Sequence, residues 1–261
     1  MPQPLRFDRD QTGAVQVPSR APLGYVNAVE TFALVDGPGV RYLVLMQGCK
    51  LRCLYCHNPE TWALEDGAEC SAEDLFSKAW RYHNYWSNNG GVTVGGGEPL
   101  LQMDFVAGFF ELLKERGVHT ALDTAGAPYC EDLAWQSGFQ RLMGACDLVL
   151  LDMKCADPER HRKLTGHSNE NILAMARRLS DMGKPMWIRH VLVPGITDDR
   201  ENLRAIKAFV GSLDTVERVE VLPYSCMAQL KWEACGLSYP LAEVPEPDQG
   251  QVDFAESILC R

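Results

Sequence analysis

The stretch "RYLVLMQGCKLRCLYCHNP", residues 41–59, joins an apolar run to a loop that carries three cysteines. Residues 41–47 are rich in Val and Leu and are followed by a glycine, which is typical of a buried β-strand. Cys49, Cys53 and Cys56 come directly after this run, in CxxxCxxC spacing. Because ligands collect at the carboxyl ends of the strands in parallel α/β folds, the stretch predicts a strand with a site at its end.

Further apolar runs of the same kind follow along the chain, at residues 91–95, 119–124, 148–154, 186–193 and 218–224. Segments with helical spacing alternate with them, at residues 71–86, 102–116, 131–143, 168–182 and 198–212, and a last one covers 249–260. Repeated strand-helix units predict a parallel sheet with right-handed crossovers. The pattern leaves two α/β architectures open, a doubly wound sheet and a partial TIM-like barrel.

The composition predicts a single large domain. The chain has 261 residues, of which 46% are hydrophobic, and this suffices for one folded core. Residues 1–24 mix Pro, Gln, Gly and charges of both signs, and they lack the apolar centre of a secretory signal. We therefore predict a flexible N-terminal extension over residues 1–24, whose possible role as an organelle address stays open, and a domain over residues 25–261.

Charge and cysteine usage exclude several classes of protein. The formal net charge of −10 argues against a general nucleic-acid binder, which needs a basic face. The sequence has no apolar run of about 18 residues, so we expect no membrane span. Apart from the three in the loop, the cysteines are scattered singly, as small core residues of a protein in the reducing cytoplasm are.

The three cysteines of the loop predict an inorganic centre. Thiolate sulfur suits zinc or an iron–sulfur cluster. Structural zinc sites usually close with four protein ligands, whereas three ligands leave a metal position open for a substrate or water. The alternative is a Cys3His zinc site closed by His57. His57 adjoins Cys56, however, and zinc-site histidines usually lie several residues from the nearest ligand.

Other candidate site residues also follow predicted strands. The turn "TVGGGEP", residues 93–99, carries three glycines that let the backbone approach a ligand closely. Asp123, Thr124 and Asp152 end the next two strands, where they could hold a cation or cap the following helices. Arg189 lies inside an apolar strand, so we expect a carboxylate or a ligand as its partner, because a buried guanidinium is costly unless it is paired.

The cysteine loop and the glycine turn together resemble the radical S-adenosylmethionine enzymes. The resemblance implies a partial (β/α)6 barrel in which Cys49, Cys53 and Cys56 hold a 4Fe-4S cluster with one iron left open for S-adenosylmethionine. An electron passed through the cluster would cleave this cofactor, which is consumed, to methionine and a 5′-deoxyadenosyl radical. Tyr55 matches an aromatic residue near the adenine. The motif that holds the methionine amino group corresponds to Gly95, Gly96, Gly97 and Glu98.

Within this family, the segments "VDGPGVR", "CHNPETW", "LLDMK", "LTGHSN" and "WIRHVLVPG" resemble the activating enzymes of glycyl radical enzymes. Such enzymes remove a hydrogen atom from a backbone glycine of a partner protein. The resemblance implies a monovalent cation held by Asp123, Thr124, Asp152 and the carbonyl of Leu150. It also implies contacts with S-adenosylmethionine from Asn58, Asp123, Asp152, Lys154, Arg189, Val191 and Leu222.

The same resemblance suggests partners. The short interval from Trp62 to Cys70 leaves no room for the ferredoxin-like insertion of many relatives, which points to the branch that acts on pyruvate formate-lyase. Asp36 and His57 match residues that grip the glycine loop of the substrate protein. The alternative is that Asp36 is only a turn residue and that His57 only packs within its loop. Ser225 replaces the usual His, which bears on the exact partner. The implied reductant is flavodoxin or ferredoxin.

Two other functions stay open at this point. One is a radical S-adenosylmethionine enzyme that acts on another glycyl radical enzyme, a small molecule or a peptide. The other is a non-enzymatic module that binds zinc or an iron–sulfur cluster, which would leave the glycine, aspartate and arginine motifs without a role.

Overall fold

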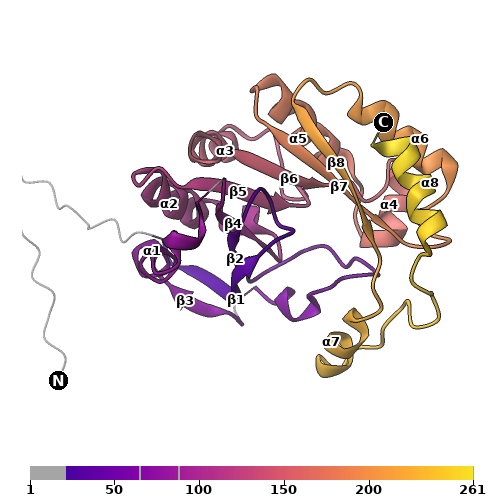
Figure 1. Cartoon of the computed structure of the whole chain (residues 1–261), viewed down its shortest axis with the longest axis horizontal. Coiled ribbons are helices and arrows are strands. Elements are labelled where there is room, and N and C mark those ends of the chain that lie inside the picture. Colours follow the sequence, from indigo (N-terminus) through magenta and orange to yellow (C-terminus); the bar gives the residue numbers. More distant parts are fainter. Residues whose placement is uncertain (1–21, 65, 88, 261) are drawn as a thin grey trace, which may run out of the picture.

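The computed structural model describes residues 22–64, 66–87 and 89–260 (Figure 1). Most of the predicted N-terminal extension, residues 1–21, lies outside these ranges. The chain forms an eight-stranded sheet in the order β3-β1-β2-β4-β5-β6-β7-β8. In the part of the chain that is described, no helix is both long and apolar enough to cross a membrane.

Six strands of this sheet run parallel and confirm the six predicted strands. They are β2 (Arg41–Met46), β4 (Gly91–Gly96), β5 (His119–Thr124), β6 (Leu148–Asp152), β7 (Met186–Leu192) and β8 (Val216–Pro223). Their spatial order follows the chain throughout, whereas a doubly wound sheet reverses its order at a switch point. Of the two architectures that the sequence left open, the chain adopts the partial TIM-like barrel.

Two antiparallel strands extend the sheet beyond β2, and sequence analysis predicted neither. β1 (Gly24–Ala33) pairs with β2, and β3 (Ala68–Cys70) pairs with β1. An antiparallel strand at the edge of a sheet can keep one face in water. β1 accordingly carries polar residues such as Asn27 and Glu30, and it lacks the continuous apolar run that marks the buried strands.

The helices confirm the predicted segments, with two additions. The predicted ones are α1 (Ala72–Trp80), α2 (Met103–Lys114), α3 (Leu133–Ala145), α5 (Glu170–Asp181), α6 (Arg200–Val210) and α8 (Gln249–Leu259). Short 3-10 turns are η1 (Pro59–Thr61), η2 (His83–Tyr85) and η3 (Pro99–Gln102). The prediction for α1 ran to residue 86, but the helix ends at Trp80 because the chain then turns into η2.

Sequence analysis missed α4 (Pro158–Thr165) and α7 (Ala228–Ala234). The signals for α4 were present: Asp157 caps its first turn, Pro158 starts it and Gly166 ends it in the left-handed region at φ 85°. Both helices are too short to show a helical period. In Figure 1, α7 stands apart from the other helices.

Three groups of buried side chains hold the described part of the chain together, and the smallest consists of Ala121, Leu148 and Leu150. The largest group packs the helices against the sheet and includes Phe105, Phe109 and Phe110 of α2. A smaller group lies around the cysteine loop and includes Leu51, Tyr55, Tyr224, Trp232 and Tyr239. The loop is therefore part of a packed structure rather than a free surface segment.

Candidate active site

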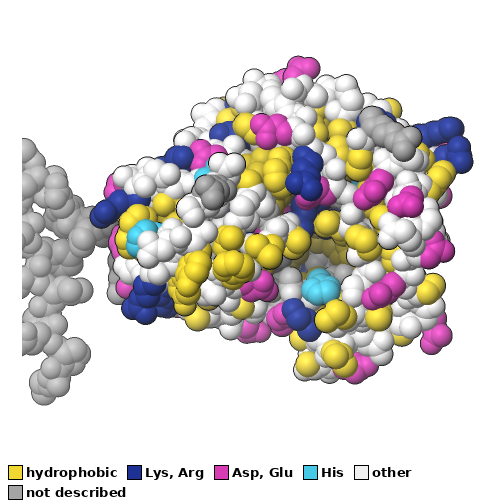
Figure 2. All heavy atoms as spheres, in the orientation of Figure 1, with side chains coloured by type: hydrophobic (Ala, Val, Ile, Leu, Met, Phe, Trp, Pro, Cys, Tyr) yellow, Lys and Arg dark blue, Asp and Glu magenta, His cyan; other side chains and the backbone are white. Residues whose placement is uncertain are grey.

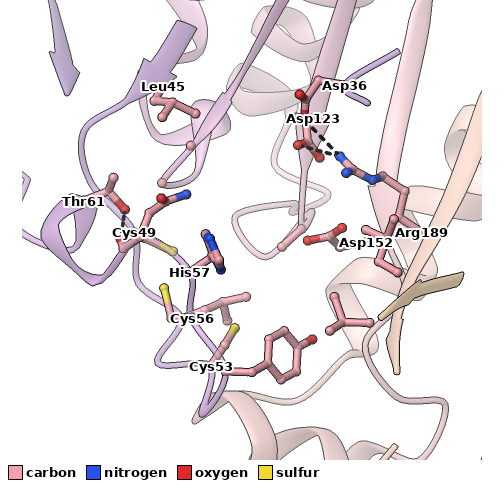
Figure 3. A pocket seen from close by; sticks show the side chains of 18 of the residues that line it. Asp36, Leu45, Cys49, Cys53, Cys56, His57, Thr61, Asp123, Asp152 and Arg189 are labelled. Atoms are coloured by element: carbon pink, nitrogen blue, oxygen red, sulfur yellow. Dashed lines mark hydrogen bonds and ion pairs between the residues drawn. The ribbon is translucent and has the colours of Figure 1, made fainter. Parts of the chain in front are cut away.

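A cavity of about 530 Å³ opens at the carboxyl ends of the parallel strands. Figure 2 shows this hollow bordered by hydrophobic, charged and histidine side chains. In Figure 3, the three cysteines lie along one wall, and Asp123, Asp152 and Arg189 face them. The cavity collects most predicted site residues: Asp36, Cys49, Cys53, Tyr55, Cys56, His57, Asn58, Gly96, Gly97, Asp123, Thr124, Asp152, Lys154, Arg189, Val191 and Leu222.

The cysteine loop, residues 49–58, is anchored on two sides by backbone hydrogen bonds. The N–H of Gly48 donates to the carbonyl oxygen of Thr61 at 2.7 Å. The N–H of Leu54 donates to the carbonyl oxygen of Leu164 in α4 at 2.9 Å. These bonds replace the regular pairing that a loop lacks, so they fix the direction in which the thiols point.

Burial keeps the three thiols protonated in the absence of a cationic centre. Burial and the charge of Glu98 raise the pKa of Cys49 to about 12. Burial raises the pKa of Cys53 to about 11, and it also raises the pKa of Cys56. Bound iron would stabilise the thiolates directly, and a donor set of three sulfurs fits an iron–sulfur cluster. The residues of the loop therefore fit the group that the family implies.

The alternative of a zinc site closed by His57 finds no support in the geometry. Among the described residues, no three His, Cys, Asp or Glu side chains converge on the position of a single metal ion. His57 also lines the cavity, and burial and the charge of Lys231 lower its pKa.

Helix α7 supports the cysteine loop from outside the barrel, and sequence analysis missed this contribution. The indole N–H of Trp232 donates to the carbonyl oxygen of Cys56 at 2.8 Å. The ammonium group of Lys231 donates to Oδ1 of Asn58 at 2.7 Å and to Oε1 of Glu60 at 3.0 Å. The helix has only seven residues and lies far from the loop in the sequence, so the role of α7 became visible only in three dimensions.

Replacing Trp232 by Phe is expected to loosen the loop. The change keeps most of the ring but removes the donor to the Cys56 carbonyl, which lowers the free energy of unfolding by about 1 kcal/mol. Urea denaturation of the two proteins measures the difference. The control is Trp86→Phe, because the buried indole N–H of Trp86 has no hydrogen-bond partner among the described residues. Equal losses at the two positions would contradict a contribution from the Cys56 bond.

The glycine turn after β4 packs backbone against backbone on the start of the cysteine loop. Gly97 N–H donates to the carbonyl oxygen of Met46 at 3.0 Å, and Glu98 N–H donates to that of Gly48 at 2.7 Å. A Cβ atom on Gly97 would lie 2.3 Å from the Gly48 oxygen. Gly96 has a φ of 99°, which L side chains rarely adopt. The glycines thus bring two loops together at the cavity.

A Gly97→Ala substitution is expected to push the two loops apart. Its methyl group meets backbone rather than a flexible side chain, so we expect a loss of about 1–3 kcal/mol in the free energy of unfolding. Denaturation with urea tests this. The matched control is Gly108→Ala in α2, where the nearest heavy atom lies 3.9 Å from the new Cβ and alanine favours the helix. A Gly97 variant as stable as the wild type would contradict the contact.

Glu98 and Gly95 lie behind the cavity wall rather than in it. The Glu98 carboxylate accepts hydrogen bonds from the Thr124 hydroxyl at 2.5 Å and from Ala125 N–H at 3.0 Å, and burial raises its pKa. A Cβ atom on Gly95 would lie 3.0 Å from Cβ of Asp123. Glu98 therefore joins the ends of β4 and β5, which is a positioning role within the motif.

Arg189 on β7 holds the facing wall together. Its Nη1 lies 3.0 Å from Oδ2 of Asp123, and carboxylate oxygens of Asp36 and Glu220 lie 3.8 Å and 3.9 Å from the guanidinium. Arg189 is buried, with 8% of its surface exposed. Its contact with Asp123 confirms the carboxylate partner that the sequence predicted for a buried guanidinium. Burial raises the pKa of Asp123 to about 7, although the charge of Arg189 opposes this, and the charge of Asp152 adds to it.

Lys154 forms a second ion pair beside the first. Its ammonium group donates to Oδ2 of Asp152 at 2.7 Å and lies 5.6 Å from the centre of the Tyr55 ring. Burial lowers the pKa of Lys154, but the charge of Asp152, the hydrogen bond to it and the neighbouring Tyr55 and Cys53 together outweigh burial and raise this pKa well above its usual value. Lys154 is therefore a permanent cation in the cavity wall, between the cysteine loop and β6.

Two polar groups of the cavity wall have no hydrogen-bond partner among the described residues, the Tyr55 hydroxyl and Nε of Arg189. Buried polar atoms without a partner are rare because they cost free energy. A bound polar ligand would satisfy them. Val191 and Leu222 pair across β7 and β8 and add apolar surface to the same cavity. Polar groups beside an apolar patch fit S-adenosylmethionine, which carries charged methionine groups and a flat adenine.

The residues predicted to hold a monovalent cation come together only in part. Asp123, Thr124 and Asp152 line the cavity, whereas Leu150 lies within β6 and does not line it. The Thr124 hydroxyl donates to Glu98 and accepts from the N–H of Gly126 at 2.9 Å. One lone pair of that hydroxyl is left for a cation.

Comparison with known proteins agrees with this site. The chain is 48% identical over 238 residues to a pyruvate formate-lyase-activating enzyme of Streptococcus mutans. The aligned region covers 90% of this chain and 90% of the relative. It is 48% identical over 238 residues to the protein of the same name from Listeria monocytogenes, with 91% of this chain and 96% of the relative covered. The description of the family model that matches residues 43–205 is "Radical SAM superfamily", where SAM stands for S-adenosylmethionine.

A solved structure shows the same fold. A radical SAM methyltransferase from Sphaerobacter thermophilus matches with a TM-score of 0.61 at 16% identity, over 98% of this chain and 73% of that one. The 48% sequence identity to the two relatives, over nearly their full length, shows the family as well as the fold. The chain therefore belongs to the radical SAM superfamily and, within it, to the family of pyruvate formate-lyase-activating enzymes.

Proposed function

We propose that this protein installs a glycyl radical on pyruvate formate-lyase by reductive cleavage of S-adenosylmethionine. Two relatives that bear the name pyruvate formate-lyase-activating enzyme are 48% identical to it over 238 residues. The observation that carries the proposal is the cavity in which three thiols face a wall of paired carboxylates and cations. A cluster and a charged cofactor need these two walls at one site.

In this proposal Cys49, Cys53 and Cys56 ligate the 4Fe-4S cluster. When bound, the cluster and S-adenosylmethionine supply the radical chemistry that removes one hydrogen atom from a glycine. The chain positions these groups and excludes water from them. Its three thiols leave one iron without a protein ligand, and the backbone contact between Gly97 and Gly48 fixes the loop against the glycine turn.

The facing wall orients S-adenosylmethionine. Nε of Arg189 and the hydroxyl of Tyr55 are free to bind polar groups of the cofactor, and Val191 and Leu222 contact the adenine. Asn58 is held by Lys231 at the edge of the cysteine loop, close enough to the cavity to contribute as well. The backbone of Gly96 and Gly97, with Gly95 and Glu98 behind it, receives the methionine amino group.

Asp123, Thr124 and Asp152 form the proposed monovalent cation site, with the carbonyl of Leu150 as a further ligand. Two carboxylates beside a hydroxyl are hard oxygen donors of the kind that such cations prefer. Lys154 already neutralises part of the charge of Asp152. A bound cation would therefore neutralise only the negative charge that Lys154 leaves on these carboxylates.

The partner protein must bring a backbone glycine to the cavity mouth. Asp36 and His57 line the cavity, and we propose that they contact the loop that carries this glycine. Ser225 lies at the same mouth, where the related enzymes have His. Flavodoxin or ferredoxin supplies the electron, and ten free cysteines favour the reducing cytoplasm as the location.

The hydrogen transfer itself tests this function. Pyruvate formate-lyase in which glycine carries deuterium at the α-carbon is mixed with the anaerobically reconstituted, reduced protein and S-adenosylmethionine. We expect one deuterium atom in the 5′-deoxyadenosine that forms. 5′-Deoxyadenosine without deuterium, in the presence of this partner, would show that the hydrogen atom comes from another molecule.

A further inference from the structure

The cysteine loop has a buried side with apolar residues and cysteine, and an exposed side with basic residues. Leu51, Cys53 and Tyr55 point into the fold and are buried, whereas Lys50 and Arg52 alternate with them and are exposed. Each of these two cations is the direct chain neighbour of a cysteine, about 3.8 Å away between Cα atoms. Lys50 and Arg52 thus place positive charge on the exposed side of the loop.

Helix α4 adds to this charge, because its last turn packs on the same loop. The N–H of Arg52 donates to the carbonyl oxygen of Thr165 at 2.7 Å. Nε2 of His167 lies 3.1 Å from the carbonyl oxygen of Lys50, which ties the turn after α4 to the loop. Lys163 lies in this last turn and is exposed.

We define the basic surface as Lys50, Arg52 and Lys163. Residues 49–58 contain no Asp or Glu, and neither do residues 160–167. The ammonium groups of Lys50 and Lys163 have no ion-pair partner within the described ranges 22–64, 66–87 and 89–260. The whole chain has a formal net charge of −10, so this surface is an exception to the charge of the molecule.

We propose that the basic surface is the docking site of a one-electron carrier protein whose redox group is ringed by carboxylates. The proposal rests on the proposed function, which needs an external electron at the cysteine loop. The carrier loses one electron and the centre held by the loop gains it, and no bond forms or breaks. Transient electron-transfer complexes have small interfaces and depend on complementary charge for their association rate.

The charge reversal Lys50→Glu with Lys163→Glu tests the proposal. Neither ammonium group holds the loop, whereas Arg52 donates to the carbonyl oxygen of Cys49 and is left unchanged. Stopped-flow absorbance follows reduction of the reconstituted protein by reduced flavodoxin and, separately, by dithionite. At low ionic strength we expect flavodoxin to react about tenfold more slowly or worse, with a weaker dependence on salt, while the rate with dithionite stays unchanged.

A matched control has the same change of net charge elsewhere. Lys78 on α1 and Arg204 on α6 are exposed, and Lys78→Glu with Arg204→Glu should leave the rate with flavodoxin close to that of the wild type. Equal slowing in both double variants, or an unchanged rate in the first, would overturn the docking site. If the first variant loses its cluster, Lys50→Gln with Lys163→Gln repeats the test. A protein that flavodoxin reduces normally but that forms no glycyl radical would contradict the proposed function alone.

Discussion

A Cys53→Ala variant is expected to form no glycyl radical while it remains folded. Its sulfur is one of three thiols at the cavity wall, and a cluster that loses one of three protein ligands is not held at the site. Removing a single sulfur beside a cavity leaves the larger helix-side core untouched, so we expect a loss of stability of about 1 kcal/mol. Iron content, circular dichroism and the yield of 5′-deoxyadenosine measure the three effects.

The control for this prediction is a buried cysteine outside the cavity. Cys146 is buried and donates from Sγ to the carbonyl oxygen of Leu148 at 3.1 Å. A Cys146→Ala variant should keep its cluster and its activity. The same substitution is made at Cys49 and Cys56. If all three variants still cleave S-adenosylmethionine, the assignment of the cluster ligands is contradicted.

An Arg189→Met variant is expected to lose both stability and affinity for S-adenosylmethionine. Breaking a buried ion pair costs about 3–5 kcal/mol, and because water reaches Asp123 in part we expect about 2–3 kcal/mol here. The pair lies in the cavity wall, so the wall also loses its free Nε donor. Urea denaturation and isothermal titration with S-adenosylmethionine measure the two losses.

The stability loss in this variant should depend on pH. Burial raises the pKa of Asp123 to about 7, so its ionisation lowers the stability of the folded state as the pH rises through this value. At about pH 5 the carboxyl is protonated and the loss of Arg189 costs little, whereas at about pH 8 the carboxylate lacks its partner. The difference in unfolding free energy from the wild type is therefore expected to be larger at the higher pH.

A double variant separates the two roles of Arg189. Arg189→Met with Asp123→Asn removes the buried charge together with its partner, so stability should recover and its extra pH dependence should disappear. Affinity for S-adenosylmethionine should stay low, because both groups are absent from the cavity wall. Recovery of the affinity along with the stability would show that Arg189 acts only as a structural ion pair.

The parallel part of the fold could be predicted from the sequence because its strands are buried on both faces. A run such as residues 148–151 is apolar and buried throughout, so its position can be found from the sequence. β1 could not be found in this way, since most of its residues are partly or fully exposed and only the short β3 lies beyond it in the sheet. The choice between a barrel and a doubly wound sheet needed the spatial order of the strands, which no local pattern contains.

The candidate site could be predicted to a large extent because its residues follow strands. Side chains that end neighbouring parallel strands must meet at one edge of the sheet, which is why Asp123, Asp152 and the cysteines share a cavity. Lys231 and Trp232 could not be placed by this rule, because they reach the loop from α7, outside the sheet. Glu98 lies in the glycine turn that the sequence singled out, but its bonds to Thr124 and Ala125 depend on a contact between two loops.

The most direct test of the proposed function is an electron paramagnetic resonance spectrum. The protein is reconstituted and reduced without oxygen, and it is then mixed with S-adenosylmethionine and pyruvate formate-lyase. We predict the doublet signal of a glycyl radical on the partner, and its absence in the Cys53→Ala variant. If the wild-type protein gives no doublet, activation of pyruvate formate-lyase is contradicted. If 5′-deoxyadenosine nevertheless forms in the same sample, the cleavage of S-adenosylmethionine stands and only the partner is wrong.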